Sequence, residues 1–268
     1  MYNAFYGLSS NPFDKQNLNV SDAFLSNDHR QALDRLNYLK DIRGIGVFTA
    51  RPGMGKSFAL RCFAKGLNQN LHQIEYICLS TISVSEFYKQ LCLAFGLDAT
   101  GGKAAMFKAI QERIYYLYKE KKRPFILAID EAQYLSSGIL KDLKMIMNQG
   151  YDSLNCFTLI LCGEPYLNHT LEKSFHEALK QRITVHYNYQ GLDDGEVSSY
   201  ISHKLSCAGA AKTIISEAAL SAVHSYSQGN PRIIDNLMTT ALTLGAQMEK
   251  LEIDADVILA SVNACSLT

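Results

Sequence analysis

The segment GIGVFTARPGMGKSFALRCF, residues 44–63, constrains the fold of this chain more than any other. An apolar run leads into a turn with Pro52, Gly53 and Gly55, and a Lys-Ser pair then opens a helical pattern. The glycines allow successive backbone N–H groups to point at one anion, and the helix presents its positive end to the same place. The segment therefore predicts an α/β fold with a phosphate site between strand and helix.

The turn fits the P-loop pattern GxxxxGK[ST], except that Ala50 replaces the first glycine. We expect Lys56 to contact the β- and γ-phosphates of a nucleoside triphosphate, and the Ser57 hydroxyl to ligate Mg²⁺. The other residues expected around the nucleotide are Ala50, Arg51, Pro52, Gly53, Met54, Gly55 and Phe58. The alternative is a glycine-proline turn that binds nothing.

A second motif, FILAIDEAQ at residues 125–133, ends an apolar strand in two acids, as a Walker B element does. Charge at the end of a buried strand is costly unless a cation is near. Asp130 can hold Mg²⁺, largely through water, and Glu131 can polarise the water that attacks the γ-phosphate. The expected cofactors are ATP and Mg²⁺; the alternative is a solvated acidic turn.

Three later residues are candidates for completing the site. Glu164 follows an apolar strand, where it can sense the γ-phosphate or simply begin a helix. Arg182 precedes the last strand, where it can reach the nucleotide of a neighbouring subunit or be an ordinary surface arginine. Arg232 follows GNP at a helix start, where a cation opposes the helix dipole unless an anion faces it. We expect Arg232 to reach the nucleotide.

Apolar strands alternate with helical patterns up to about residue 192. Strands are expected at 44–50, 74–80, 124–130, 157–163 and 183–189, and helices at 57–68, 83–96, 103–119 and 136–149. This alternation indicates a parallel sheet with helices on both faces.

After this point the strand signal stops. Helical patterns over 193–207, 216–226 and 231–248 predict a small helical bundle. We place the boundary in YQGLDDGE. This gives an α/β nucleotide-binding domain over residues 1–191, including an N-terminal segment 1–40, and a helical lid subdomain over 192–268.

Composition limits the environment and the partners. The 26 basic and 26 acidic residues cancel, so binding to nucleic acid requires a local patch. No apolar run approaches the roughly 20 residues that cross a bilayer, and the N-terminus lacks a signal core. The seven cysteines show no CxxC spacing, which is typical of reduced thiols. We expect a cytoplasmic protein with no membrane partner.

The P-loop, IDEAQ, the QR pair before the last strand and GNPR in a helical C-terminal part together resemble an AAA+ ATPase. More narrowly, YGLSSNPFD, FLSNDHRQALDRLNYL, LILCGEPYL, LKQRI and YISHKLSCAGA are similar to the ExeA-type family. That family includes type II secretion ATPases and the transposition helpers TniB and Mu B. The similarity spans nearly the whole chain and implies a P-loop AAA+ sheet with a helical lid.

The resemblance also implies roles for individual residues. Arg182 would be the arginine finger offered in trans, and Arg232 the sensor-2 residue. The family usually has glutamine where Glu164 stands, which leaves the sensor-1 role open. Phe13 of the NPF motif would line the adenine side, although from the sequence it can equally be a core anchor.

Within this family, secretion ATPases continue into a membrane span and a periplasmic domain, whereas this chain ends at Thr268. We therefore expect a helper ATPase of a mobile element. Such helpers form ATP-dependent rings or helical filaments on duplex DNA and recruit or stimulate a DDE-type transposase. Slow hydrolysis, stimulated by oligomer and DNA, would reset the assembly. The alternatives are an ExeA-like ATPase of secretion or envelope assembly, a nucleotide-dependent interaction module that hardly hydrolyses, and, least favoured, a small-molecule kinase.

Support for DNA binding comes from a basic cluster in KEKKRPF, residues 119–125. In a ring, segments after the second strand can face the pore and touch backbone phosphates without reading bases. The candidate contacts are Lys103, Lys119, Lys121, Lys122 and Arg123. The alternative is a set of solvated helix faces, with the nearby tyrosines in helix packing.

Overall fold

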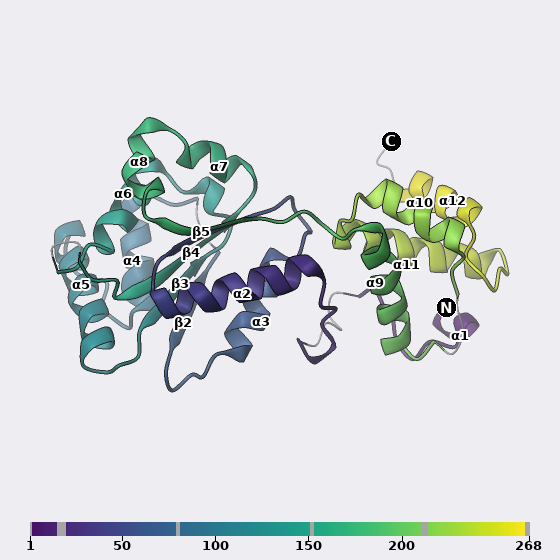
Figure 1. Ribbon diagram of the computed structural model, residues 1–268, viewed down its shortest axis with the longest axis horizontal. Helices are drawn as coiled ribbons and strands as arrows, with labels where there is room; N and C mark the ends of the chain where they lie inside the picture. The colour runs from purple at the N-terminus through teal and green to yellow at the C-terminus, as the bar shows by residue number, and fades with distance from the viewer. Residues whose placement is uncertain (1, 15–19, 79–80, 151–152, 211–213, 266–268) are drawn as a thin grey trace. The chain divides into compact units, whose positions relative to one another are not determined.

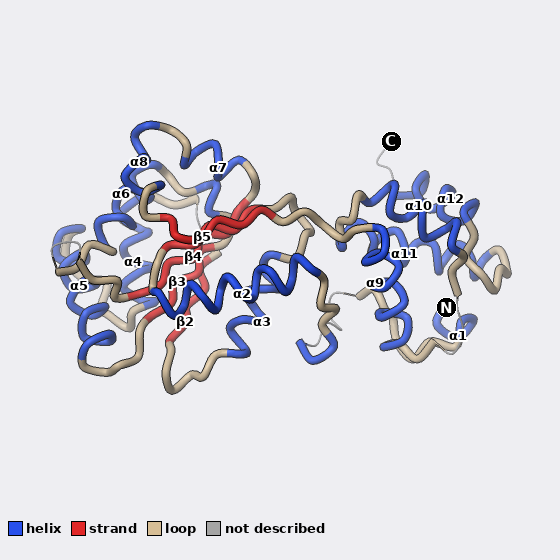
Figure 2. The backbone as a smooth tube through the Cα atoms, viewed as in Figure 1, coloured by secondary structure: helices blue, strands red, loops and turns tan. Residues whose placement is uncertain are grey.

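The computed structural model describes residues 2–14, 20–78, 81–150, 153–210 and 214–265 (Figures 1 and 2). The chain falls into two compact units. An α/β unit comprises Gln31–Pro52 and Lys56–Tyr189, and a helical unit comprises Met1–Arg30, Gly53–Gly55 and Gln190–Thr268. The first 30 residues thus group with the C-terminal helices, whereas the domain boundary drawn from the sequence stays a prediction.

A five-stranded sheet forms the centre of the α/β unit (Figure 2). Its strand order is β2-β3-β4-β1-β5, and every neighbouring pair is parallel. The strands are β1 (Ile45–Thr49), β2 (Gln73–Ile77), β3 (Phe125–Ile129), β4 (Phe157–Gly163) and β5 (Ile183–Asn188). All residues of β1, β3 and β4 are buried, which is why these strands read as continuous apolar runs. The expected strand at 74–80 ends at Ile77, and its residues 79 and 80 lie outside the described residues.

Helices cover both faces of this sheet (Figure 1). On one face lie α2 (Asn27–Ile42) and α3 (Lys56–Gly66); on the other lie α4 (Val84–Ala94), α5 (Lys103–Lys119) and α6 (Ser137–Ile146). Side chains of β3 alternate between the layers: Ile126 and Ala128 pack toward α2 and α3, and Leu127 and Ile129 toward α4 to α6. The predicted α/β architecture with two covered faces is confirmed.

Four short elements complete the α/β unit. They are η3 (Ala132–Tyr134), α7 (Tyr166–Leu171), η4 (Ser174–His176) and α8 (Glu177–Lys180). The element η3 directly follows β3, and α7, η4 and α8 lie between β4 and β5. All four therefore belong to connections that begin at the carboxyl end of a central strand.

The helical unit has its own apolar core. Its elements are α1 (Tyr2–Tyr6), η2 (Val20–Asp22), α9 (Asp194–Cys207), α10 (Glu217–Ser227), α11 (Pro231–Gln247) and α12 (Ala255–Cys265). The Asn230 side chain accepts hydrogen bonds from the backbone N–H groups of Arg232 and Ile233, so α11 begins with the cap and N1 proline that GNPR predicts. The predicted C-terminal helical part is confirmed, with α12 as an addition.

The N-terminal segment is tied to this helical core. The Tyr6 hydroxyl donates to the Lys250 carbonyl at 2.9 Å, and the Ser9 hydroxyl donates to the Ala208 carbonyl at 2.9 Å. Leu8 and Phe13 are both buried in the core. Within the described ranges, no helix combines the length and apolarity needed to cross a membrane.

Candidate nucleotide-binding site

The sheet topology brings three of the predicted segments to one edge. Since the strands are parallel, their carboxyl ends lie together, and β4 lies between β1 and β3. The P-loop follows β1, the acidic pair Asp130 and Glu131 follows β3, and Glu164 follows β4. This edge of an open α/β sheet is where such folds bind their ligands.

The P-loop adopts the backbone that its glycines allow. Gly53 and Gly55 both have φ of +90°, a conformation that L side chains rarely adopt. Ala50 is buried and has negative φ, so a methyl group is accommodated at the first position of the motif. The Ala50 N–H donates to the Gly163 carbonyl at 3.1 Å, which fixes the start of the loop against β4.

Lys56 lies in the first turn of α3 with its ammonium group turned into the loop. Nζ donates to the Ala50 carbonyl at 2.8 Å and lies 3.5 Å from the Arg51 carbonyl. The side chain is buried, and this burial lowers the pKa of Lys56, although the nearby charges of Asp130, Glu131 and Glu164 oppose the shift. A buried cation held by carbonyl groups is suited to an incoming polyphosphate, which would favour its charged form.

Asp130 is the centre of a hydrogen-bonded cluster beside the P-loop. Its Oδ2 accepts from the Ser57 hydroxyl at 2.6 Å and from the Tyr76 hydroxyl at 2.8 Å, and its Oδ1 accepts from the Glu131 N–H at 2.9 Å. Burial, followed by the bond to Asp130, raises the pKa of Tyr76. Ser57 and Asp130 were both predicted as Mg²⁺ ligands, and their oxygens form the hard donor set that this ion prefers. The residues present therefore fit the ion.

Gln133 connects Glu131 to the end of β4. Its Nε2 donates to Glu131 Oε2 at 2.7 Å, and its Oε1 accepts from the Glu164 N–H at 3.0 Å. Gln133 is buried, and a Cβ added to Gly163 would lie 2.7 Å from its Oε1. Glu131 itself is exposed and has φ of +53°. The buried amide thus orients the exposed carboxylate that was predicted to act on water.

Residues 40–171 match a family model described as AAA domain. The match covers just under half of the chain, and the fold of these residues is that of a P-loop AAA+ domain. The Walker-type site described above lies inside the matched segment, and ATP with Mg²⁺ is the standard cofactor pair of AAA+ ATPases.

A relative by sequence is the general secretion pathway protein A of Aeromonas hydrophila, which is 31% identical over 245 residues. The match covers 90% of this chain but 44% of the relative, so the chain spans less than half of that protein's length.

Solved structures share the fold. Cdc6p from Pyrobaculum aerophilum matches with a TM-score of 0.69 at 16% identity, over 96% of this chain and 71% of that chain. The Aeropyrum pernix ORC1 protein in complex with DNA matches with a TM-score of 0.62 at 14% identity, over 91% of this chain and 66% of that chain. The Thermotoga maritima RuvB variant T158V matches with a TM-score of 0.54 at 16% identity, over 90% of this chain and 68% of that chain. These neighbours confirm the P-loop AAA+ fold.

Arg182 lies outside the cluster of site residues of its own α/β unit. It directly precedes β5, whose first residue pairs with the first residue of β1, so it lies at the amino edge of the sheet. A strand of five or six residues separates that edge from the P-loop by about 17 Å. This position does not bring the guanidinium to the P-loop of the same sheet.

Arg232 and Phe13 both belong to the helical unit. Arg232 is exposed in the first turn of α11, and a Cβ added to Gly53, which groups with this unit, would lie 2.6 Å from the Arg232 Cβ. Phe13 is 4% exposed and packs in the helical core, with Lys204 Nζ 5.9 Å from its ring centroid. Of the two readings of Phe13, its burial favours the core anchor.

Of the predicted DNA contacts, those at 119–123 lie away from the P-loop edge, and Lys103 lies at the other end of α5. Lys103 at the start of α5 pairs with the buried Asp142 carboxylate at 2.6 Å. Lys121 lies 5.6 Å from the centroid of the exposed Tyr116 ring. The exposed residues Lys119 and Lys122, with the partly buried Arg123, precede β3 and so lie at the amino edge of the sheet.

A polar network that the sequence did not suggest ties β1 to β5. Asn168 of α7 donates from Nδ2 to Thr49 Oγ1 at 3.1 Å and to Asn188 Oδ1 at 3.0 Å. Thr49 also donates to Asn188, and His186 Nε2 lies 3.0 Å from Asn168 Oδ1. Since Thr49 directly precedes the P-loop, this network fixes the point where the loop begins.

Proposed function

We propose that this AAA+ ATPase assembles with copies of itself on duplex DNA and regulates transposition by recruiting or activating a DDE-type transposase. The ATPase part of the proposal depends on one observation. Ser57 and Asp130 lie in direct contact beside Lys56, with Glu131 oriented by a buried amide. A turn that binds nothing gives no reason to gather these polar and charged groups, whereas binding and hydrolysis of ATP with Mg²⁺ would use each of them.

The roles of the residues follow from their positions. Lys56 would exchange its bonds to loop carbonyls for the β- and γ-phosphate oxygens. Ser57 and Asp130 would hold Mg²⁺, which supplies charge neutralisation at the phosphates. Glu131 would accept a hydrogen bond from the attacking water and orient it, with Gln133 restricting its rotamers.

Assembly is supported by the position of Arg182. We infer that this guanidinium, at the amino edge of its own sheet, faces the phosphate site of a neighbouring protomer in the assembly, where it would stabilise charge in the transition state. This makes hydrolysis dependent on assembly. In the same arrangement, Glu164 and Arg232 are candidates for sensing the γ-phosphate within one protomer.

The DNA part of the proposal is supported by the exposed lysines Lys119, Lys121 and Lys122 and by the fold shared with an ORC1 protein solved in complex with DNA. Contacts from lysine to backbone phosphates predict binding without sequence preference. A cytoplasmic location belongs to the same proposal. The test is binding of random duplex DNA, which should require ATP and weaken steeply with salt; affinity indifferent to both would refute it.

The second candidate is an ATPase of a secretion or envelope-assembly system. It is favoured by the 31% identity to general secretion pathway protein A over 90% of this chain. The two candidates separate in a strand-transfer assay with a purified DDE transposase from the same genome. Stimulation that requires ATP supports the transposition role, and a secretion ATPase should give none.

A further inference from the structure

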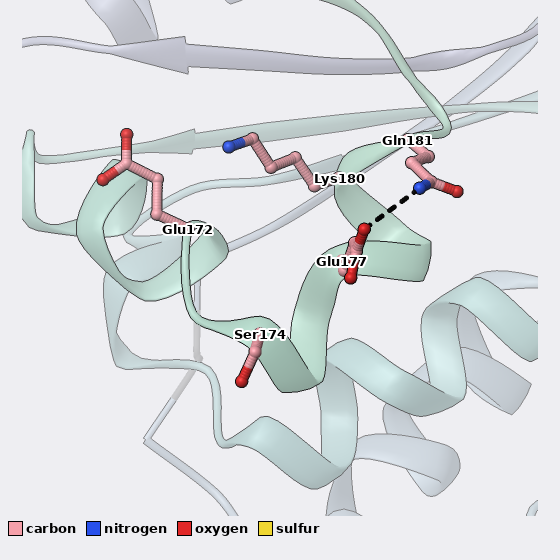
Figure 3. A pocket seen from close by; sticks show the side chains of 5 residues that line it. All are labelled: Glu172, Ser174, Glu177, Lys180 and Gln181. Carbon is pink, nitrogen blue, oxygen red and sulfur yellow. Dashed lines mark hydrogen bonds between the residues drawn. The ribbon is translucent and has the colours of Figure 1, made fainter.

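Two hollows flank the short segment formed by η4 and α8, and their charges differ. The first, of about 450 Å³, is lined by Glu172, Ser174, Glu177, Lys180 and Gln181 (Figure 3). Within it, Gln181 donates from Nε2 to Glu177 Oε1 at 3.4 Å. Carboxylates and a cation share this hollow, so it favours no particular ligand charge.

The second hollow, of about 300 Å³, has an apolar lining and lies between α6 and the η4–α8 segment. The apolar lining is Met145, Phe175, Ala178 and Leu179. Met145 and Phe175 remain 45% and 50% exposed. Exposed methionine and aromatic side chains gathered at one hollow are typical of protein–protein contact sites rather than of an ordinary surface.

The charged side chains of this second hollow are all lysines. Lys141 and Lys144 line it, and the charge of Lys173 acts on the adjacent His176. Within the described part of the chain, none of these three lysines takes part in an ion pair, and no acidic residue lines the hollow. Lys141 Nζ instead lies 5.6 Å from the centroid of the Phe175 ring. Charge complementarity therefore favours an acidic ligand.

His176 adds an unmet hydrogen bond to the same hollow. The residue is 1% exposed, and neither ring nitrogen has a partner among the residues that the structure describes. Its imidazole packs against the half-exposed Phe175 ring at a tilted angle, with centroids 4.4 Å apart. An imidazole always carries at least one N–H, and buried polar groups in native proteins are nearly always bonded. An acceptor carried by a ligand of this hollow would meet this donor.

We propose that this hollow docks an acidic peptide segment of a partner protein, in which an apolar side chain is flanked by carboxylates. The apolar side chain fills the space against Met145 and Leu179, and the carboxylates bond Lys141 and Lys144. Nucleic acid phosphates would use the same lysines but leave the apolar lining uncovered, so a peptide is the better fit. This inference does not depend on the proposed role in transposition.

The test measures fluorescence polarisation of short fluorescein-labelled peptides with the full chain. One peptide carries a central leucine or phenylalanine among Asp and Glu; a second replaces the acids with Asn and Gln; a third replaces the apolar residue with Ser. The variant K141E/K144E removes the basic lining. K65E/K89E is the matched control, because it makes the same charge change at exposed lysines of α3 and α4. Circular dichroism confirms that each variant is folded.

We expect the acidic apolar peptide alone to bind. K141E/K144E should weaken its binding by about tenfold or more, and F175A should weaken it too, while K65E/K89E leaves it unchanged. Equal binding of all three peptides, no binding of any, or equal weakening by both double variants would overturn the proposal. Loss of random duplex DNA binding in K141E/K144E, with no peptide bound, would assign the hollow to nucleic acid and overturn it as well.

Discussion

Replacing Gln133 with leucine should separate ATP binding from ATP hydrolysis in this protein. The substitution keeps the approximate volume of the buried side chain but removes two hydrogen bonds, the one to Glu131 Oε2 at 2.7 Å and the one from the Glu164 N–H at 3.0 Å. Glu131 loses a contact that orients it toward water. Lys56, Ser57 and Asp130 keep all of their contacts.

The expected magnitudes follow from those two bonds. Leaving the Glu164 N–H without a partner should lower the free energy of unfolding by about 1–3 kcal/mol. Loss of orientation at one general base should lower kcat by about 10- to 100-fold, since positioned acid–base catalysis as a whole contributes about 100- to 10,000-fold. The Kd for ATP in the presence of Mg²⁺ should stay within about twofold, because no proposed phosphate or Mg²⁺ contact is removed.

The assay is steady-state ATP hydrolysis together with calorimetric ATP binding, at a temperature where the variant is folded. Gln149→Leu is the matched control: the Gln149 amide donates to the Gln111 carbonyl, outside the site, and its loss should leave kcat unchanged. If Q133L hydrolyses ATP at the wild-type rate, Gln133 does not orient Glu131. If it loses ATP binding in proportion to kcat, the amide supports the whole site and the separation of roles is wrong.

Three further predictions concern assembly, the acidic cluster and acid stability. R182A and E131Q should each be inactive. Random mixing of the two variants should restore about one quarter of the wild-type rate of hydrolysis, because only one of the four kinds of neighbouring pair then has both the Glu131 carboxylate and the Arg182 guanidinium at one site. A mixture as inactive as its components contradicts an arginine supplied in trans. Y76F removes one of three donors to Asp130 and should lower the free energy of unfolding by about 1 kcal/mol, measured by urea denaturation, and an unchanged midpoint contradicts it. Burial lowers the pKa of His176 in the folded protein, so the unfolded chain takes up this proton at a higher pH than the folded one, and stability should fall as the pH drops below about 6.5. In thermal melts from pH 7 to pH 5, the melting temperature of H176L should fall less than that of the wild type. Parallel curves for the two proteins would contradict this.

The central sheet was predictable because its strands are buried on both faces. Such strands are continuous apolar runs, and the P-loop and IDEAQ motifs mark the ends of two of them. The parallel order then brings Lys56 and Asp130 to one edge without any further information. This is why the motif residues could be assigned from the sequence before their contacts were known.

The contacts within the site were less predictable. Tyr76 reaches Asp130 from the neighbouring strand, and Asn168 reaches Thr49 from a helix more than a hundred positions later in the chain. Pairings of this kind depend on strand order, which no local pattern specifies. Gln133 was in view as part of IDEAQ, but its role depends on the Glu164 backbone, which only the fold brings near.

Besides short helices such as α1 and α8, two longer helices were missed for a related reason. The sequence pattern predicted no element over α2 or α12. Both α2 and α12 mix buried and exposed residues at helical spacing, yet neither follows a strand in the repeating α/β order that guided the other assignments. Phe13 illustrates the same limit: the sequence left open whether it lines the adenine side or anchors the core, and the fold buries its ring in the helical core.

The most direct test of the account is calorimetric titration of ATP into the purified wild-type protein and into K56A, each with and without Mg²⁺. Wild type should take up one ATP per chain and bind more tightly when Mg²⁺ is present, and K56A should lose most of that affinity while remaining folded. Equal binding by both proteins, or no uptake by wild type at saturating Mg²⁺, would contradict a triphosphate site at the junction of the P-loop and Asp130.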